Sequence, residues 1–344
     1  RRDQEHNRVD VGVFQAMSFW ETKRVVVIGG AVNIGSFVVE SLCRRGARVR
    51  VLDNLESGSL DFLEQVRDAI EFVEGDTTDL DFCREAIRDA DAVLNLAAQA
   101  PGVGHSHRNH VSLLGRNTQI GAVVLEACRA EEVGRVLMVS SSCVYPDDAP
   151  VPTPELPLFT GEPERVNSGY GWAKRFQELQ AAEYAGRFGM SIAIARPFNA
   201  YGPRDVAKGE RSHVIPALIE RILSDEPELT VWGDGSQTRS FIHTRDLAEA
   251  LLLLTERHAV CEAVNLGSDR EVSMARLAEL LMEAADTRKP IVFDTTKPTG
   301  CRRKAADMST FRRLFGKDIH SVPLEEGLAE MVEAHRRHFT KQPA

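Results

Sequence analysis

Apolar positions along the first 200 residues follow two alternating patterns. Short runs rich in valine, isoleucine and leucine predict buried strands, and longer stretches with apolar residues every three or four positions predict helices. The predicted strands are Arg24–Ile28, Arg48–Leu52, Glu71–Val73, Ala92–Leu96, Val136–Ser140 and Ile192–Ala195. The predicted helices are Ile34–Arg45, Leu80–Arg88, Thr118–Ala130 and Trp172–Arg187. Because strand and helix alternate, we predict an α/β fold built on a doubly wound parallel sheet with helices on both faces.

The alternation fades after Pro197. Helices are predicted there over Val214–Leu223, Leu247–Thr255 and Ala275–Ala285, and short strands over Thr230–Trp232 and Ala263–Leu266. The segment Pro146–Pro163 holds six of the 15 prolines, which excludes a regular helix and predicts an ordered surface loop. We divide the chain into an N-terminal extension (1–22, with Met17 a candidate natural start), a first domain (23–200) and a smaller, interleaved C-terminal α/β region (201–340).

Composition narrows the classes of partner. Acidic residues number 51 against 42 basic, so the net charge of −9 argues against a general binder of nucleic acid or of anionic membranes. No apolar run approaches the ~18 residues of a membrane-spanning helix. The six cysteines are scattered without a C-x-x-C pair, which favours a reducing, cytoplasmic location.

The first predicted strand runs directly into the turn Gly29-Gly30-Ala31-Val32-Asn33-Ile34-Gly35 and then into a helix. Such a turn directs backbone N–H groups and the positive helix end toward a pyrophosphate, so we predict a Rossmann-like dinucleotide site. Asp53 ends the second strand, where a carboxylate accepts ribose hydroxyls and repels a 2′-phosphate, which favours NAD over NADP. Asp76 is placed to reach the adenine edge. The alternative is a tight turn that binds no ligand.

One position of the turn departs from the expected pattern. Val32 stands where G-x-x-G-x-x-G has its middle glycine. A Cβ there is expected to push the pyrophosphate away or to force a different turn, and so to weaken cofactor binding. The predicted cofactor residues are Gly29, Ala31, Asn33, Ile34, Gly35, Asp53, Asn54, Asp76, Thr77, Leu96, Ala97, Ala98, Tyr170 and Lys174.

A second group of chemically active residues follows the fifth predicted strand. Ser141 lies at the end of that strand, where α/β sheets bind ligands, and Tyr170 and Lys174 are four positions apart on one helix face. Lys174 would lower the pKa of the tyrosine, and Ser141 would hydrogen-bond the same substrate oxygen. A phenolate can then remove a hydroxyl proton while a hydride leaves the carbon for nicotinamide. The alternative for the Tyr–Lys pair is an ordinary helix surface.

Together these residues resemble the extended short-chain dehydrogenase/reductase family, the nucleotide-sugar epimerases and dehydratases, over roughly residues 23–335. Arg196–Pro203 resembles the family segment R-x-x-N-x-Y-G-P, which implies that Asn199 contacts substrate. Gly233–Phe241 resembles the W-G-D-G segment, which implies that Arg239 holds a nucleotide diphosphate. The resemblance also implies that the C-terminal region binds substrate, and that a homodimer packs through Thr118–Ala130 and Tyr170–Arg187.

Cys143 separates the subfamilies. Family dehydratases carry an Asp-Glu pair where this chain has Ser142-Cys143, which disfavours that reaction. A cysteine here resembles GDP-mannose 3,5-epimerases and GDP-fucose synthases, in which it is half of an acid/base pair. His213 resembles the partner in the synthases, whereas the epimerases have a lysine. The alternatives are a small buried hydrophobe for Cys143 and a solvated loop residue for His213.

Other segments resemble the epimerases. The stretch from Gly102-Val103-Gly104 to Thr118 has the epimerase pattern and length, and Asp53 suits an enzyme that recycles bound NAD. The implied substrate residues are Gly102, Val103, Gly104, Ser141, Cys143, Asn199, His213, Arg221, Arg239 and Arg302. We therefore predict a GDP-mannose 3,5-epimerase-like enzyme that oxidises C4, epimerises C3 and C5 with Cys143 and His213, and reduces C4 again.

Three alternatives stay open. The first is a GDP-4-keto-6-deoxy-sugar 3,5-epimerase-reductase, favoured by His213, and the second is an epimerase of another nucleotide sugar. The third is a non-catalytic nucleotide-binding regulator, for which Val32 is the main argument. His105, His107 and His110 suggest a metal, but no matched cysteine or carboxylate set accompanies them, so we expect sugar or solvent contacts instead. His243 is expected to be structural.

Overall fold

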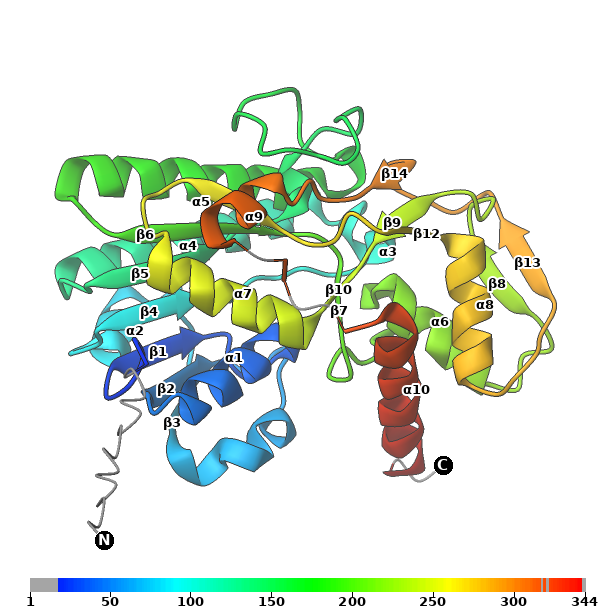
Figure 1. Ribbon diagram of the computed structural model, residues 1–344, viewed down its shortest axis with the longest axis horizontal. Coiled ribbons are helices and arrows are strands. Elements are labelled where there is room, and N and C mark those ends of the chain that lie inside the picture. The colour runs from blue at the N-terminus through cyan, green and yellow to red at the C-terminus, as the bar shows by residue number, and fades with distance from the viewer. Residues whose placement is uncertain (1–17, 317, 320–321, 342–344) are drawn as a thin grey trace, which may run out of the picture.

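The computed structural model describes residues 18–316, 318–319 and 322–341. Within these residues, seven strands form a parallel sheet with the order β11-β6-β5-β4-β1-β2-β3 (Figure 1). The strands are β1 (Arg24–Ile28), β2 (Arg48–Asp53), β3 (Ile70–Glu74), β4 (Ala92–Asn95), β5 (Arg135–Val139), β6 (Ile192–Pro197) and β11 (Ala263–Leu266). The chain proceeds in opposite directions from β1 and β4, so a ligand crevice is expected at the carboxyl ends of these two strands. The doubly wound α/β prediction is confirmed.

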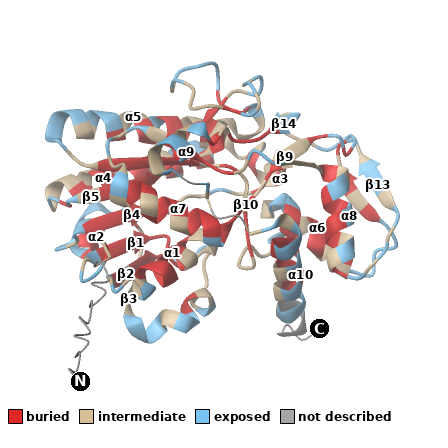
Figure 2. Cartoon of the chain, in the orientation of Figure 1, coloured by how far each residue is buried: buried red, intermediate tan, exposed pale blue. Residues whose placement is uncertain are grey.

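Two helical layers cover the sheet. One face carries α1 (Asn33–Arg44) and α7 (Thr244–Arg257), and the other carries α2 (Leu80–Ile87), α4 (His110–Ala130) and α5 (Ser168–Phe188) (Figures 1 and 2). Strand β1 places Val25 and Val27 in the first layer and Val26 and Ile28 in the second. Burial on both faces explains why its sequence is an unbroken apolar run.

A second lobe has its own core. Figure 1 shows it beside the carboxyl edge of the sheet, and its buried residues form a separate hydrophobic cluster. Its main elements are α6 (Val214–Leu223), β8 (Leu229–Trp232), α8 (Met274–Ala284), β13 (Ile291–Asp294) and α10 (Leu324–Lys341). Small sheets join β8 to β13, β7 (Ala200–Tyr201) to β10 (Ile242–His243), and β9 (Thr238–Ser240) to β12 (Glu271–Ser273) and β14 (Arg303–Lys304).

The remaining described elements are short. They are the 3₁₀ turns η1 (Leu60–Ala69), η2 (Ser142–Val144), η3 (Arg165–Asn167) and η4 (Gly209–Arg211), and the helices α3 (Val103–Ser106) and α9 (Ser309–Phe315). Between its stretches in the second lobe, the chain returns to the main sheet as α7 and β11, where β11 pairs with β6. The two lobes are therefore interleaved along the sequence.

The predicted extension over residues 1–22 lies largely outside the described residues. Its last five residues are described, and they pack on the fold. Trp20 is fully buried in the layer of α1 and α7, Phe19 packs against that layer, and the Arg135 guanidinium lies 5.2 Å from the Phe19 ring centre.

The proline-rich segment is irregular but well anchored, as predicted. Thr153 donates its N–H to Ala305 and accepts from the N–H of Asp307. The buried Arg175 of α5 donates to the carbonyls of Val144, Thr160 and Gly161. These bonds satisfy backbone groups that have no partner in a sheet or helix, and they hold the end of the loop against the carboxyl end of β5.

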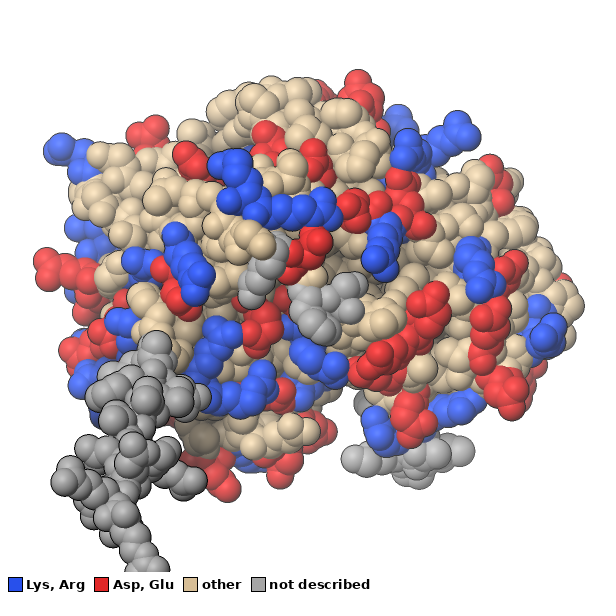
Figure 3. All heavy atoms as spheres, in the orientation of Figure 1, with Lys and Arg blue, Asp and Glu red and all other residues tan. Residues whose placement is uncertain are grey.

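The surface carries both signs of charge. Figure 3 shows lysine and arginine side chains interspersed with acidic ones on the face it presents. In the part of the chain that the structure describes, no helix is both long and apolar enough to span a membrane.

Candidate active site

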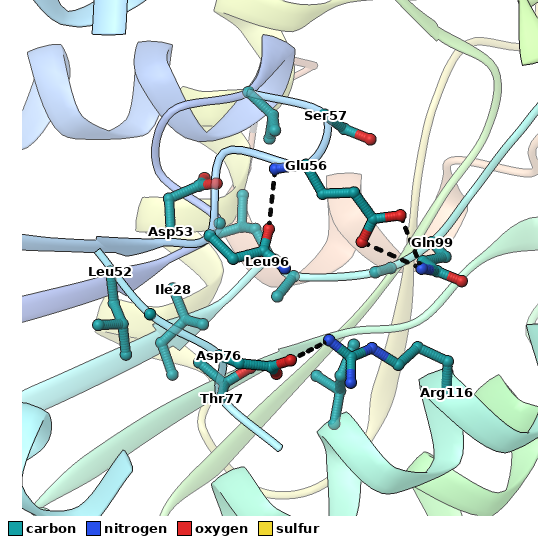
Figure 4. A pocket seen from close by; sticks show the side chains of 17 residues that line it. Ile28, Leu52, Asp53, Glu56, Ser57, Asp76, Thr77, Leu96, Gln99 and Arg116 are labelled. Carbon is teal, nitrogen blue, oxygen red and sulfur yellow. Dashed lines mark hydrogen bonds and ion pairs between the residues drawn. The ribbon is translucent and has the colours of Figure 1, made fainter. Parts of the chain in front are cut away.

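A cleft lies where β1, β2, β3 and β4 end (Figure 4). The predicted cofactor residues that line it are Gly29, Asp53, Asn54, Asp76, Thr77, Leu96, Ala97 and Ala98. Val32, which the sequence singled out as the departure in the turn, also lines it. Sequence reasoning did not select the other lining residues, which are Ile28, Leu52, Glu56, Ser57, Gly75, Gln99, Arg116 and Ile120. Most of these lining residues lie next to a predicted cofactor residue, so a prediction that included one or two more residues at each strand end would have contained them. Arg116 and Ile120 instead come from α4.

The glycine turn has the close packing that a dinucleotide site needs. A Cβ on Gly35 would lie 2.0 Å from the carbonyl oxygen of Gly29, so only glycine lets α1 approach β1 this closely. Gly29 itself has φ +75°, which glycine adopts without strain. These positions fit a pyrophosphate at the start of α1.

Val32 occupies the N-cap of α1 without backbone strain. Its φ of −110° and ψ of 178° are extended values that any residue adopts. The different turn that a Cβ was expected to force is therefore not required. The side chain nevertheless lines the cleft, so the predicted effect on cofactor affinity stays a prediction.

Asp53 connects the glycine turn to the end of β2. One carboxylate oxygen accepts the N–H of Ala31 at 3.0 Å, and the other accepts the N–H of Leu55 at 2.9 Å. Burial raises the pKa of Asp53, and these hydrogen bonds together with the charge of Lys208 oppose the rise. A carboxylate held at this place fits the ribose of an NAD molecule.

Two polar pairs face the cleft from opposite walls. Figure 4 shows Arg116 reaching from α4 to Asp76, and Gln99 reaching to Glu56. Burial opposes a lower pKa for Asp76, but hydrogen bonds from Arg116 and Thr78 outweigh it and lower the pKa. Both carboxylate oxygens of Asp76 thus have partners, so its predicted contact with adenine stays a prediction.

Ser141, Tyr170 and Lys174 converge where β5 ends. The Ser141 hydroxyl accepts the N–H of Cys143 at 3.1 Å. Burial raises the pKa of Tyr170 and nearby Cys143 adds to the rise, whereas a hydrogen bond with Ser141 opposes it. Lys174 is buried 5.7 Å from the Tyr170 ring centre and donates to the Val139 carbonyl at 2.7 Å. Burial lowers the pKa of Lys174 to about 7.

Cys143 has partners that sequence reasoning did not select. The Lys304 ammonium donates to the Cys143 sulfur at 3.7 Å and to the Glu164 carboxylate at 2.9 Å. The Cys301 thiol donates to the same carboxylate at 3.7 Å. Burial raises the pKa of Cys143 to about 12, and the charge of Lys304 opposes that rise. The only sequence signal was that Lys304 lies two positions after Arg302, one of the implied substrate residues.

His213 is held by two other groups. Its Nδ1 lies 3.1 Å from an Asp205 oxygen, and its Nε2 lies 3.0 Å from the Ala100 carbonyl oxygen. The charge of Asp205 raises the pKa of His213 to about 9, so the ring is an imidazolium at neutral pH. Among the described residues no hydrogen bond joins it to Cys143, and the proposed acid/base pair stays a prediction.

The predicted Gly102–Gly104 stretch meets the second lobe. A Cβ on Gly102 would lie 1.9 Å from the Ser212 carbonyl oxygen, and one on Gly104 would lie 3.0 Å from the Trp232 ring. Arg221 donates to the Thr230 carbonyl and lies 5.9 Å from the Trp232 ring centre. Val103 begins α3, the short helix formed by this stretch.

The other predicted substrate residues have these positions. Asn199 has φ +31° and donates to the Ser240 carbonyl at 2.8 Å, and Arg239 donates to the carbonyls of Thr238 and Thr299. Arg302 is exposed. The pairing of β14 with β9 places Lys304 opposite Arg239, which brings this segment to the site.

The histidines outside the site have structural contacts. His107 Nδ1 lies 3.0 Å from the Val103 carbonyl oxygen, and His110 accepts the N–H of Gly169. No group of three or more candidate metal ligands occurs within the described ranges. His243 caps α7 by accepting the N–H of Arg245, which confirms its predicted structural role.

Known proteins resemble this chain over most of its length. The probable GDP-L-fucose synthase 1 of Oryza sativa subsp. japonica is 37% identical over 243 residues, covering 69% of this chain and 74% of the relative. The GDP-L-fucose synthase of Sinorhizobium fredii is 30% identical over 322 residues, covering 92% and 97%. These relatives carry the name of the first alternative activity and not of the leading prediction.

Solved structures agree on the fold. The UDP-glucose 4-epimerase of Thermotoga maritima, solved with UDP-glucose, has a TM-score of 0.82 and 30% identity, and the match covers 92% of this chain and 99% of that one. The Thermus thermophilus UDP-glucose 4-epimerase, solved with NAD, has a TM-score of 0.79 and 27% identity, covering 91% and 99%.

The family model named NAD dependent epimerase/dehydratase family matches residues 25–267. This stretch runs from β1 through the glycine turn, the Ser–Tyr–Lys residues and β11, so it spans the cleft and the candidate residues Ser141, Tyr170 and Lys174. The match confirms the predicted NAD cofactor at the level of the family. The chain therefore belongs to the NAD dependent epimerase/dehydratase family, as the extended short-chain dehydrogenase/reductase resemblance predicted.

Proposed function

We propose that the protein is a nucleotide-sugar 3,5-epimerase that acts on a 4-keto GDP-sugar and completes the reaction by reducing C4, as a GDP-L-fucose synthase does. The observation that carries this proposal is the half-buried Cys143 thiol, which lies in one cluster with Ser141 and Tyr170. An imidazolium at His213 and the relatives named GDP-L-fucose synthase support the reductase form.

The chemistry at C4 uses Ser141 and Tyr170. The cofactor, when bound in the cleft, would supply the hydride as NADH or accept it as NAD⁺. The Ser141 and Tyr170 hydroxyls donate hydrogen bonds to the C4 oxygen, and Tyr170 gives its proton to that oxygen when C4 is reduced. Lys174 holds the first turn of α5 against β5 through the Val139 carbonyl and so fixes the position of Tyr170.

The chemistry at C3 and C5 uses Cys143 and His213. A ketone at C4 makes the protons on both neighbouring carbons acidic, because the resulting carbanion is an enolate. One group removes a proton from one face of the sugar, and the other group returns a proton from the opposite face. The raised pKa values of His213 and Cys143 favour the protonated form of each group in the resting protein, so the group that removes the sugar proton must first release its own proton to solvent, and the other group then returns a proton from its protonated form.

The second candidate is a GDP-mannose 3,5-epimerase. Asp53 favours it, because a buried carboxylate at the end of β2 opposes a 2′-phosphate and suits an enzyme that keeps one NAD through the cycle. In that reaction C4 is first oxidised and later reduced by the same cofactor. The Gly102–Thr118 stretch also supports it.

We also propose a homodimer formed through α4 and α5. The exposed fractions of Val111, Leu114 and Phe176 are 88%, 37% and 48%, and all three lie on these two helices. Large apolar side chains left in solvent on adjacent helices indicate a covered surface. The cysteines are free thiols, which supports the predicted cytoplasmic location.

Deuterium exchange distinguishes these functions. The protein is incubated in heavy water with GDP-mannose or with a GDP-4-keto-6-deoxy sugar, and the sugar is followed by NMR. Exchange at C3 and C5 of the keto sugar alone, with consumption of reduced cofactor, supports the epimerase-reductase. Exchange into GDP-mannose without net cofactor reduction supports the second candidate. No turnover of either sugar contradicts both.

A further inference from the structure

The Cys143 thiol lies between two buried charges of opposite sign. Lys304 is 9% exposed and Glu164 is 4% exposed, and their side chains form an ion pair at 2.9 Å. The ammonium donates to the Cys143 sulfur at 3.7 Å, and a hydrogen bond joins the thiol to the Glu164 carboxylate. The thiol therefore contacts both members of the pair.

The fold brings these residues together from distant segments. Lys304 is on β14, where the neighbouring Arg303 pairs with Glu271 and Lys304 takes the buried side. Glu164 follows the proline-rich segment, and its N–H donates to the Cys143 carbonyl at 3.2 Å. Asn167 donates to the Glu164 carboxylate at 2.8 Å and fixes its orientation. Backbone and side-chain bonds thus hold both charges at fixed places beside the sulfur.

The groups that face Cys143 are few and can be named. They are Ser141 from the end of β5, Tyr170 from α5, Glu164, and Lys304 from β14, with Cys301 on the far side of the Glu164 carboxylate. Although burial opposes it, Lys304 lowers the pKa of Glu164 to about 2. Burial also opposes a higher pKa for Lys304, but the nearby acidic groups raise it. The pair is therefore ionised throughout the working pH range.

A buried ion pair is expensive to desolvate and is often no more stable than apolar residues of the same size. Its place beside a reactive sulfur gives it another use. Lys304 stabilises a negative sulfur, whereas Glu164 opposes one and accepts the thiol proton in a hydrogen bond.

We propose that Glu164 and Lys304 are positioning residues that set the protonation of Cys143, with Glu164 keeping the resting sulfur as a thiol and Lys304 stabilising the thiolate that forms during proton transfer. This inference rests on the proposed function for its role in turnover. In that step Cys143 acts as the acid: after a deprotonated His213 has removed a proton from the opposite face and left the enolate, the S–H bond breaks and a C–H bond forms on the enolate carbon. The enolate electron pair enters the new bond, and the negative charge passes to the sulfur beside Lys304.

The test is the alkylation rate of Cys143 in the full-length protein without substrate. Iodoacetamide reacts with the thiolate, so its rate against pH reports the pKa of the thiol. The Cys143 peptide is quantified by mass spectrometry, with Cys43 as an internal reference. Lys304→Met should slow alkylation at pH 8 by about tenfold or more, and Glu164→Gln should quicken it by a similar factor. The double variant should fall between the two.

The control is an exposed ion pair of the same type. Arg276 and Glu279 pair on the surface of α8, so Arg276→Met and Glu279→Gln make the same changes in net charge. Neither control should change the Cys143 rate by more than about twofold. Lys304→Arg, which keeps the charge, should retain the pH profile. Lys304→Gln, which also removes the charge, replaces Lys304→Met if that variant does not fold by circular dichroism.

Changes of the Cys143 alkylation rate in opposite directions in the two single variants support the proposal. Shifts in the same direction would show that the pair only packs around the sulfur, and no shift would show that it does not act on the thiol at all, so either result overturns the proposal. Because no sugar is present, opposite shifts together with a failure of deuterium exchange on every nucleotide sugar would count against the proposed function alone.

Discussion

Individual residues decide how well the cleft accepts its cofactor. Val32 lines the cleft at the start of α1 with an unstrained, extended backbone. Val32→Gly removes the side chain from the place where the pyrophosphate approaches, and it leaves α1 with a better N-cap, because glycine is preferred over valine at that position. We expect NAD affinity to increase by about tenfold, measured by titration calorimetry. Unchanged affinity would mean that the valine already clears the cofactor.

His213 gives a second prediction at this scale. Its pKa is raised to about 9 by Asp205, so its pairing stabilises the folded protein fully below the ordinary histidine pKa and is lost as pH rises through about 9. The side chain is 49% exposed, and solvent screening reduces the contribution to about 1 kcal/mol. In urea unfolding, the parent protein should have a higher free energy of unfolding than His213→Gln at pH 6, and the two proteins should have the same free energy of unfolding at pH 10. A difference that is the same at both pH values would contradict this account.

The candidate site was predictable where its residues lie in local motifs. Asp53, Ser141, Tyr170 and Lys174 each follow a strand or share a helix turn, so their neighbours in sequence identified them. Lys304 was missed because its partner Glu164 lies 140 positions away and β14 has only two residues, too few for any pattern. Long-range contacts of this kind carry no signal in a single sequence.

At the scale of elements, the apolar pattern located most strands and helices but not their ends. Helix α6 has the bounds predicted for it, whereas α4 begins at His110 and not at Thr118. Helix α4 packs against both α2 and α5, so its apolar residues are spread around the helix and the first turns lack one clear face. The short strands β9, β12 and β14 form one small sheet, and they were not predicted because each is too short to show a pattern without its pairing partners.

The approach of α1 to β1 yields a prediction about glycine. A Cβ on Gly35 would meet backbone at 2.0 Å, so Gly35→Ala must move the helix and should cost about 3 kcal/mol or more, with loss of NAD binding. Gly186, near the end of α5, has nothing within 4 Å of the corresponding position. Gly186→Ala should therefore stabilise the protein by about 0.5–1 kcal/mol. Thermal unfolding measures the change in stability caused by each substitution. Equal changes for Gly35→Ala and Gly186→Ala would contradict the prediction.

At the scale of the whole molecule, α4 and α5 present the apolar surface on which the homodimer was proposed. Phe176→Asp places a charge in that surface and should convert the dimer to a monomer, as measured by light scattering after gel filtration. Phe159 is 66% exposed on the proline-rich segment, and Phe159→Asp should leave the mass unchanged. A monomeric parent protein, or equal behaviour of the two variants, would rule out this surface.

The return of the chain to the main sheet as α7 and β11 has a practical consequence for fragments. A polypeptide that stops at residue 200 lacks the edge partner of β6 and one of the helices that cover α1. The edge of β6 and the apolar surface that α7 normally covers would then be exposed to solvent and could associate with other copies of the fragment. We therefore expect the fragment to be insoluble on expression. Adding residues 242–267 through a short linker should restore solubility, which sedimentation of the lysate would reveal. The first 200 residues hold the cleft, yet we expect them to need a later part of the chain to remain in solution.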